Sequence, residues 1–259
     1  MALQRTQRTS SGGVQSLERA FTLLERLADA GGEAGLSELA HASGLPLPTI
    51  HRLMRTLVSL GYVRQDRSRR YSLGPRLIRL GETAGRQLGA WARPVLAELV
   101  DQVGETVNLA ILDGDEVVYV AQAPSRHSMR MFTEVGRRVL PHCTGVGKAL
   151  LSQLPREQVL DLLERTGMPA YTARTVTDPG RLLRQLTQVA RQGYALDDGE
   201  QEVGVRCVAV PVTAGPTLAA ISVSGPEGRL TRAAAARMVP AMRRAAEQLR
   251  TTLLDTAQG

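Results

Sequence analysis

Residues 36–59 read LSELAHASGLPLPTIHRLMRTLVS, and this stretch decides the fold of the N-terminal part of the chain. Ser37 precedes a helix-forming run and is the expected N-cap, whereas Gly44 is the residue type that tolerates the left-handed backbone of a helix end. A first helix is therefore predicted to stop near Ser43. A second helix is predicted to follow, with Pro48 in its first turn, because proline presets the φ angle that a helix start needs.

The second helix of this pair has two different faces. Its apolar residues recur at spacings of three, one and three, which places them on one stripe; they are Ile50, Leu53, Met54 and Leu57. Its other face carries polar and cationic side chains, namely Thr49, His51, Arg52, Arg55, Thr56 and Ser59. Two short helices with a tight corner are typical of a helix-turn-helix, whose second helix enters the major groove of DNA. An ordinary helical hairpin inside a core is the alternative, and the cationic face argues against it.

The flanking sequence completes a winged unit. Val14–Ala30 has apolar residues at helical spacing and is predicted to form a helix capped by Ser16. Tyr62–Gln65 and Tyr71–Leu73 are predicted to form a hairpin whose polar turn carries arginines. Such a hairpin after a helix-turn-helix is a wing that reaches the DNA backbone or minor groove; a merely solvated charged turn is the alternative.

Charge is unevenly distributed along the chain. Residues 1–90 hold 13 arginines and 7 acidic residues, a balance of +6, whereas residues 91–259 hold 19 basic and 18 acidic residues, a balance of +1. A domain that neutralises phosphates releases counterions and gains sequence-independent affinity for DNA. The cationic half is therefore the half expected to meet DNA.

Length and composition predict two domains in a chain of the cytoplasm. The sequence has 259 residues, and no run reaches the roughly 18 apolar residues that a membrane span needs. Its two cysteines, Cys143 and Cys207, are too few for a disulfide framework and fit a reducing compartment. Residues 1–13 lack the apolar segment of a secretory signal and are expected to form a disordered arm.

The rest of the chain divides into a linker and a second domain. We expect a winged helix-turn-helix over 14–73, a linker helix over 74–90 and an α+β domain over 91–259 with an antiparallel sheet flanked by helices. Strands are predicted at 105–112, 116–123, 129–135, 206–213 and 217–224, and helices at 92–103, 147–152, 156–165, 179–192 and 231–254. A homodimer is expected, because one such unit reads few base pairs and a dimer reads two half-sites.

Gly136–Leu151, which reads GRRVLPHCTGVGKALL, contains a first candidate binding element. Thr144 is the expected cap of the helix that follows, and the glycine-rich start exposes backbone amides that bind anions such as carboxylates. The stretch is not a phosphate loop, because His142 stands at the first glycine position and Ala149 follows Lys148. A glycine turn needed only for close packing is the alternative.

Polar residues later in the chain form a second candidate element. Ser222 and Ser224 alternate with an apolar residue and therefore share one face of a strand, where Asp197 and Cys207 are candidates to join them around a cavity. Serines that are simply tolerated on an inward face are the alternative.

These motifs together resemble the IclR family of transcriptional regulators over nearly the whole chain. The matching blocks are the winged helix-turn-helix, VGRRVLPHCTGVGKALL, RQGYALDDGEQEVGVRC and AAISVSGPEGRL. GETVNLAI, SMRM and SGPEGRLT are most similar to the branch that represses allantoin and glyoxylate utilisation. The resemblance implies a GAF-like effector domain, and dimers or dimers of dimers on operator DNA.

The resemblance also implies a pocket for a small carboxylate. Its members would be the backbone of Gly145 and Val146, four polar side chains and three apolar walls; the side chains are Asp197, Cys207, Ser222 and Ser224, and the walls are Met131, Val139 and Val205. Gly199 departs from the family pattern, which has an acidic residue there.

The hypothesis is a repressor of a catabolic operon that responds to a small carboxylate such as glyoxylate or allantoate. Thr49, Arg52 and Arg55 are the expected groove contacts, with Pro48 and His51 on the same surface; the expected backbone contacts are Arg64, Arg67, Arg69 and Arg70. An activator or dual regulator of another small-acid or aromatic-acid pathway is the alternative. A DNA-binding scaffold without an effector is a further one.

An enzyme is disfavoured, and no metal or cofactor is expected. The neighbouring His142 and Cys143 would point to different sides of a regular element, and no further ligands follow at close spacing.

Overall fold

The computed structural model describes residues 13–131, 133–214 and 217–256. The chain divides into two compact units, residues 1–84 and 85–259, and the boundary lies within helix α4 (Arg76–Leu88). Most of the arm expected at residues 1–13 lies outside the described residues.

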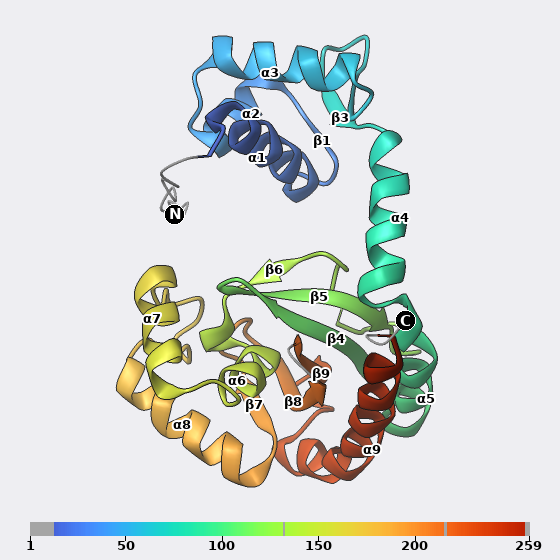
Figure 1. The fold of residues 1–259 in the computed structure, drawn as a ribbon, viewed down its shortest axis with the longest axis vertical. Helices are drawn as coiled ribbons and strands as arrows, with labels where there is room; N and C mark the ends of the chain where they lie inside the picture. The colour runs from blue at the N-terminus through green and yellow to red at the C-terminus, as the bar shows by residue number, and fades with distance from the viewer. Residues whose placement is uncertain (1–12, 132, 215–216, 257–259) are drawn as a thin grey trace. The chain divides into compact units, whose positions relative to one another are not determined.

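The first unit is a three-helix bundle with a small sheet (Figure 1). Its helices are α1 (Gln15–Asp29), α2 (Leu36–Ser43) and α3 (Leu47–Ser59). Its strands are β1 (Glu33–Ala34), β2 (Val63–Gln65) and β3 (Tyr71–Leu73), which pair antiparallel in the order β1-β3-β2. The apolar stripes of the three helices meet in one core, whose fully buried members are Leu23, Leu27, Leu39, Ile50 and Met54. The predicted winged helix-turn-helix is confirmed.

The predicted corner between α2 and α3 is confirmed, but two predicted caps are wrong. Gly44 ends α2 with a left-handed backbone, at φ +67°. The N-cap of α1 is Val14, and Ser16 lies inside the helix. The N-cap of α2 is Gly35 instead of Ser37. The Gly35 amide donates to Glu38 Oε2 at 2.7 Å. The carboxylate of Glu38, three residues along the helix, therefore satisfies the backbone amide of the N-cap residue.

The second unit is a six-stranded antiparallel sheet with helices on both faces (Figure 1). The strand order is β6-β5-β4-β9-β8-β7. The strands are β4 (Thr106–Asp113), β5 (Glu116–Ala123), β6 (Arg138–Val139), β7 (Ala195–Asp198), β8 (Val205–Ala214) and β9 (Thr217–Pro226). The predicted α+β architecture is confirmed.

The two faces of the large sheet are covered by different helices. α5 (Arg93–Val103), which the short 3-10 turn Ala90–Ala92 precedes, and α9 (Arg232–Thr256) pack on the larger apolar face. α6 (Gly145–Leu151) follows the 3-10 turn Pro141–Cys143 and packs on the opposite face, with α7 (Arg156–Thr166) and α8 (Pro179–Gln192) beyond it. Of the helices that the structure describes, none is long and apolar enough to cross a membrane.

The sheet differs from the sequence prediction at two places. The strand expected at 129–135 is wrong: the described residues there form no strand, and Phe132 lies outside the described residues. Two backbone carbonyls of this segment accept hydrogen bonds from side chains. Thr106 Oγ1 donates to Met131 O at 3.0 Å, and Arg229 donates to Met129 O at 2.8 Å. β7, which no pattern predicted, adds an edge strand beside β8.

The core of the first unit gives a stability prediction. Leu27→Ala is expected to lower the free energy of unfolding of this unit by about 2–5 kcal/mol, because Leu27 is 0% exposed and its removal leaves a cavity. Glu25→Ala, at an exposed position two residues earlier, should change it by less than about 0.5 kcal/mol. Urea unfolding followed by circular dichroism measures both, and equal losses in the two variants would contradict the packing described.

Candidate functional site

The outer face of α3 presents the side chains expected to read DNA. Ile50, Met54 and Leu57 are buried against α1 and α2. The opposite side is open to solvent; its exposed members are Pro48, His51, Arg52 and Arg55, and Thr49 is half-buried. The helix therefore presents two exposed arginines, Arg52 and Arg55, on a surface about two turns long.

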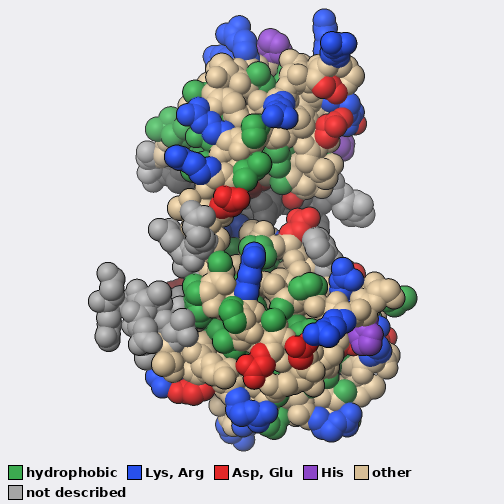
Figure 2. All heavy atoms as spheres, turned by 90° about the vertical axis from the view of Figure 1, so that its right-hand side faces the viewer, with side chains coloured by type: hydrophobic (Ala, Val, Ile, Leu, Met, Phe, Trp, Pro, Cys, Tyr) green, Lys and Arg blue, Asp and Glu red, His purple; other side chains and the backbone are tan. Residues whose placement is uncertain are grey.

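The hairpin turn is built to project arginines. Asp66 accepts hydrogen bonds from Ser68 Oγ at 2.7 Å and from the Arg70 amide at 2.8 Å, which closes the turn and holds the pKa of Asp66 below its ordinary value. Arg69 adopts a left-handed backbone at φ +62°. Arg64, Arg67 and Arg69 are all exposed, and Figure 2 shows basic side chains at the end of this unit.

Arg70 does not belong with the exposed arginines. Its Nε lies 2.6 Å from Glu33 Oε1 and its Nη2 lies 3.2 Å from Glu38 Oε2, so its charge is engaged by two carboxylates of the same unit. The two carboxylates raise the pKa of Arg70. In the structure this residue fastens the wing to the start of α2, and its expected contact with the DNA backbone stays a prediction.

In the second unit, strand register brings the predicted polar residues together. Asp197 on β7 pairs with Cys207 on β8, which pairs with Ser224 on β9, which pairs with Thr106 on β4. These residues form one row across the sheet. All four are buried: Asp197 is 4% exposed, Cys207 6%, Ser224 8% and Thr106 0%.

A second row lies two residues along the strands on the same face. Ser222 on β9 pairs with Ala209 on β8 and with Asn108 on β4. Side chains two apart on a strand share a face, so Ser222 lies beside the first row. Ser222 and Asn108 are both 0% exposed.

The start of α6 lies directly against this polar face. Thr144 caps the helix as predicted, since its hydroxyl accepts from the Gly147 amide at 3.1 Å. A Cβ on Gly145 would lie 2.8 Å from Cys207 Sγ, and one on Gly147 would lie 2.2 Å from Pro141 O. The glycines are therefore required for close packing, and the same closeness directs the Gly145 amide at the Cys207 sulfur.

The predicted apolar walls have different environments. Val139 and Val146 are buried in one cluster on the α6 side of the sheet. Val205 is half-buried and alternates with Cys207, so it shares the face of the polar row. Met131 is half-buried, and its carbonyl accepts from Thr106 at the end of that row.

Burial controls the protonation of the polar row. It raises the pKa of Asp197 to about 7, with the Glu200 carboxylate adding to the increase; the backbone amide of Glu200, at 2.7 Å, and the Lys148 ammonium oppose it. Burial and the charge of Asp197 raise the pKa of the Cys207 thiol to about 11. The Cys207 side chain is therefore a neutral thiol near pH 7, and Asp197 is close to half-protonated there.

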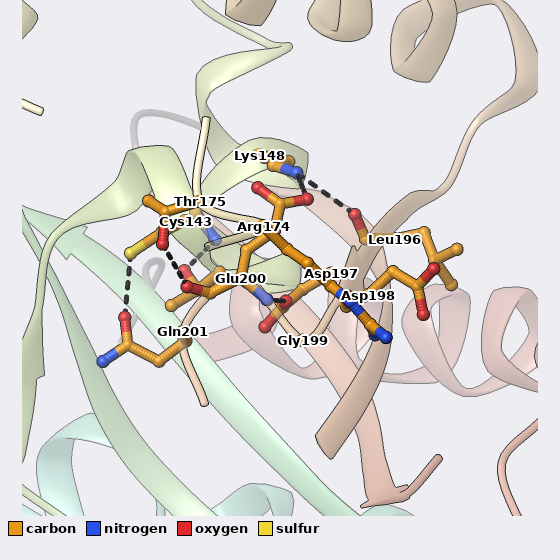
Figure 3. Close-up of polar contacts among 12 residues, drawn as sticks. Cys143, Lys148, Arg174, Thr175, Leu196, Asp197, Asp198, Gly199, Glu200 and Gln201 are labelled. Atoms are coloured by element: carbon orange, nitrogen blue, oxygen red, sulfur yellow. Dashed lines mark hydrogen bonds and ion pairs between the residues drawn. The ribbon is translucent and has the colours of Figure 1, made fainter. Parts of the chain in front are cut away.

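Lys148, the single lysine of the chain, was missed as part of this site. It is 1% exposed, and its Nζ pairs with the carboxylate of Glu200 and donates to Leu196 O at 3.3 Å (Figure 3). The pair fastens α6 to the turn after β7, and Gly199 has φ +76° in that turn. A lone lysine within an otherwise apolar helix was a signal in the sequence, because a buried ammonium requires a partner.

His142 and Cys143 do not form a nucleophilic pair. Cys143 Sγ donates to Gln201 Oε1 at 2.8 Å, whereas His142 Nε2 lies 3.0 Å from Pro169 O. Burial raises the pKa of Cys143 to about 12, which keeps the thiol protonated. Thiol nucleophiles act as thiolates, so this arrangement opposes the enzyme hypothesis.

Comparisons with known proteins agree over nearly the whole chain. Residues 16–67 match the model of the IclR helix-turn-helix domain, and residues 83–251 match that of the bacterial transcriptional regulator IclR C-terminal domain. The chain is 40% identical over 229 residues to the transcriptional repressor IclR of Escherichia coli, covering 86% of this chain and 84% of that protein. It is 36% identical over 228 residues to the repressor AllR of Salmonella typhimurium, covering 86% and 84%.

A solved structure has the same fold over both units. The IclR homolog complexed with 4-hydroxybenzoate from Microbacterium hydrocarbonoxydans has a TM-score of 0.78 and 26% identity, covering 93% of this chain and 100% of that one. These matching proteins are regulators of transcription and not enzymes.

The raised pKa of Asp197 predicts how stability depends on pH. An unfolded aspartate titrates near pH 3.9, whereas the folded pKa is about 7, so the folded state holds the proton more tightly. The stability from this group is complete below about pH 4 and is lost as the pH rises through about 7. From pH 5 to pH 8 the wild type should lose about 3 kcal/mol of free energy of unfolding, and Asp197→Asn, which has no carboxyl group at this position, should not show that loss.

Urea unfolding of both proteins across this pH range measures the difference. Burial lowers the pKa of His142, and this opposite contribution is common to both proteins and cancels. Parallel pH profiles for wild type and Asp197→Asn would contradict the buried, proton-holding carboxyl.

Proposed function

The chain belongs to the IclR family of bacterial transcriptional regulators, and we propose that it is a repressor whose hold on operator DNA is relieved by a small carboxylate. The observation that carries this proposal is the buried polar row of Asp197, Cys207 and Ser224 under the amide end of α6. A core of this kind is costly unless something uses its polar groups, and a carboxylate needs such donors when it leaves water.

The DNA-binding half of the proposal rests on the first unit. Arg52 and Arg55 are exposed on α3, where they can reach base edges, and Arg64, Arg67 and Arg69 are exposed on the hairpin, where they can reach phosphates. Thr49, Pro48 and His51 complete the α3 surface. We propose that a dimer, or a dimer of dimers, presents two such units to two half-sites.

The effector half of the proposal rests on charge and size. The amides of Gly145 and Val146 would receive the carboxylate, and Ser222, Ser224 and Asp197 would bind an oxo or hydroxyl oxygen beside it. Glyoxylate and allantoate are the proposed effectors, and an operon for allantoin or glyoxylate utilisation is the proposed target. Walls from Met131, Val139 and Val205 would exclude water.

Regulation requires that the effector bind one state of the protein better than another. A coupling of about 1–3 kcal/mol between the two sites would change operator affinity by about 5- to 150-fold, which is sufficient for a switch. We propose that the acid favours a spacing of the two DNA-reading units that no longer matches the operator.

A second candidate has the same architecture and another ligand. The Microbacterium homolog is complexed with 4-hydroxybenzoate, so this fold accommodates an aromatic acid in at least one relative. An activator or dual regulator of an aromatic-acid pathway is therefore the alternative, and a thermal-shift screen that includes both acids separates the two.

Arginine substitutions test the DNA-binding surface once the operator has been selected from a random DNA pool. Arg55→Ala should weaken operator binding by about 1–3 kcal/mol and reduce discrimination against other sequences. Arg69→Ala should weaken all DNA similarly and lower the slope of log affinity against log salt by about 0.9. Arg126→Ala is the control, since this exposed arginine belongs to the second unit and is paired with Asp101, so DNA binding should persist.

Fluorescence anisotropy at several salt concentrations gives all three quantities. Unchanged operator affinity in Arg55→Ala, or a larger loss in Arg126→Ala than in Arg69→Ala, would overturn the assigned surface.

Ser224→Ala tests the effector site. Losing one hydrogen bond to the oxo oxygen of the ligand should weaken glyoxylate binding by about 0.5–1.5 kcal/mol, and a correspondingly higher glyoxylate concentration should be needed to release the operator. Ser152→Ala is the control, because that hydroxyl donates to Ala149 O at the other end of α6. Calorimetry that finds the same affinity in wild type and Ser224→Ala would place the effector elsewhere.

A further inference from the structure

Two buried polar groups beside the candidate effector site have no hydrogen-bond partner among the described residues. They are Asn108 Nδ2 and Ser222 Oγ, and the second of these has only the Cys207 thiol beside it as a weak partner. Other buried polar atoms of the described residues also lack partners, but these two belong to residues that pair directly across β4 and β9. Buried polar groups are nearly always satisfied, so two adjacent exceptions indicate that something other than the protein satisfies them.

The orientation of Asn108 is fixed by its neighbour. Gln122 Nε2 donates to Asn108 Oδ1 at 3.1 Å, which occupies the acceptor end of the amide. The donor end, Nδ2, is the end left free. Asn108 and Ser222 therefore both offer an N–H or O–H, and two donors side by side match an oxygen acceptor.

Thr106, on the same strand and face as Asn108, shows the contrasting case. Its hydroxyl donates to Met131 O at 3.0 Å and accepts from the Ser125 amide at 3.1 Å. Both of its hydrogen-bonding functions are used within the unit. Thr106 is therefore a structural residue, whereas the free donor of Asn108 is not accounted for by the fold.

Small side chains surround the two free donors on this face. Ala110 and Ala220 pair with each other in the next row, and Ala209 pairs with Ser222. None of these methyl groups can accept a hydrogen bond, and none fills the volume that a larger side chain would. A bound molecule that reaches this face would therefore supply the acceptor that these neighbours do not.

We propose that Asn108 is a specificity residue that selects effectors carrying a neutral carbonyl oxygen beyond their carboxylate; this inference rests on the proposed effector site. The second oxygen is neutral because Asp197 and Glu200 already bring carboxylates to the same region, and the Lys148 ammonium is paired with Glu200 (Figure 3). A second carboxylate buried there would lack a counter-ion.

The spacing of the rows sets the length of such an acid. Asn108 lies one row beyond Ser224, and residues two apart on a strand are separated by about 7 Å. A two-carbon acid held at the Gly145 amide is too short to engage Asn108. An oxo, amide or ureido oxygen several bonds from the carboxylate has the required reach.

A cycle of two ligands and two proteins tests the inference. Pentanoate and 4-oxopentanoate have the same chain length and differ in one carbonyl oxygen. Calorimetry should show that the wild type binds 4-oxopentanoate about tenfold more tightly than pentanoate, the effect of one hydrogen bond to a buried donor. In Asn108→Leu the ratio should fall below about threefold, while glyoxylate affinity stays within about threefold of wild type.

Thr187→Val is the control for the cycle. It removes a hydroxyl that donates to Leu183 O within α8, outside the polar row, so it should keep the tenfold ratio. Equal affinities of the wild type for the two acids, or a ratio that survives in Asn108→Leu, would overturn the inference and leave the effector site standing. Wild type that binds none of the three acids would overturn the proposed effector site, and the inference with it.

Discussion

The close approach of α6 to β8 is the constraint on which the second unit depends. Gly145 and Gly147 leave no room for a Cβ against Cys207 and Pro141, so the backbone at the helix start lies directly against the sheet. The Thr144 cap satisfies one amide of the helix start, and the ion pair of Lys148 with Glu200 fastens the helix to the turn after β7. A buried ion pair contributes little net stability, so its value here is to hold the amide end at one place over the polar row.

The arginines of the first unit form two groups: some stabilise the position of the wing, and the others are exposed to solvent. Arg70 joins the hairpin to Glu33 and Glu38, and Arg76 donates to Leu60 O at 2.7 Å while its guanidinium lies 5.6 Å from the ring centre of Tyr62. These two fix the hairpin and the start of α4. The remaining arginines of α3 and the hairpin are left exposed, so a rigid frame presents the cationic groups that phosphates would meet.

Features that depend on local chemistry could be predicted from the sequence. The corner at Gly44, the cap at Thr144 and the sheet face shared by Ser222 and Ser224 follow from residue type and alternation, and the structure confirms them. Features that depend on a distant partner could not. The N-cap amide of α2 donates to Glu38. The segment at 129–135 forms no strand, and its carbonyls accept hydrogen bonds from Thr106 and Arg229. Arg70 pairs with carboxylates that lie 37 and 32 residues away in the sequence. Asn108 escaped notice because an asparagine within a strand has no sequence signal until its neighbours are known.

The central claim is that the amide end of α6 and the polar row beneath it hold a carboxylate. A crystal structure of the protein grown with glyoxylate tests it most directly. The account predicts electron density for the acid with its carboxylate within hydrogen-bond distance of the Gly145 and Val146 amides and its other oxygen beside Ser224. Density for glyoxylate at any other place, with the Gly145 amide still unbound at saturating acid, would contradict it.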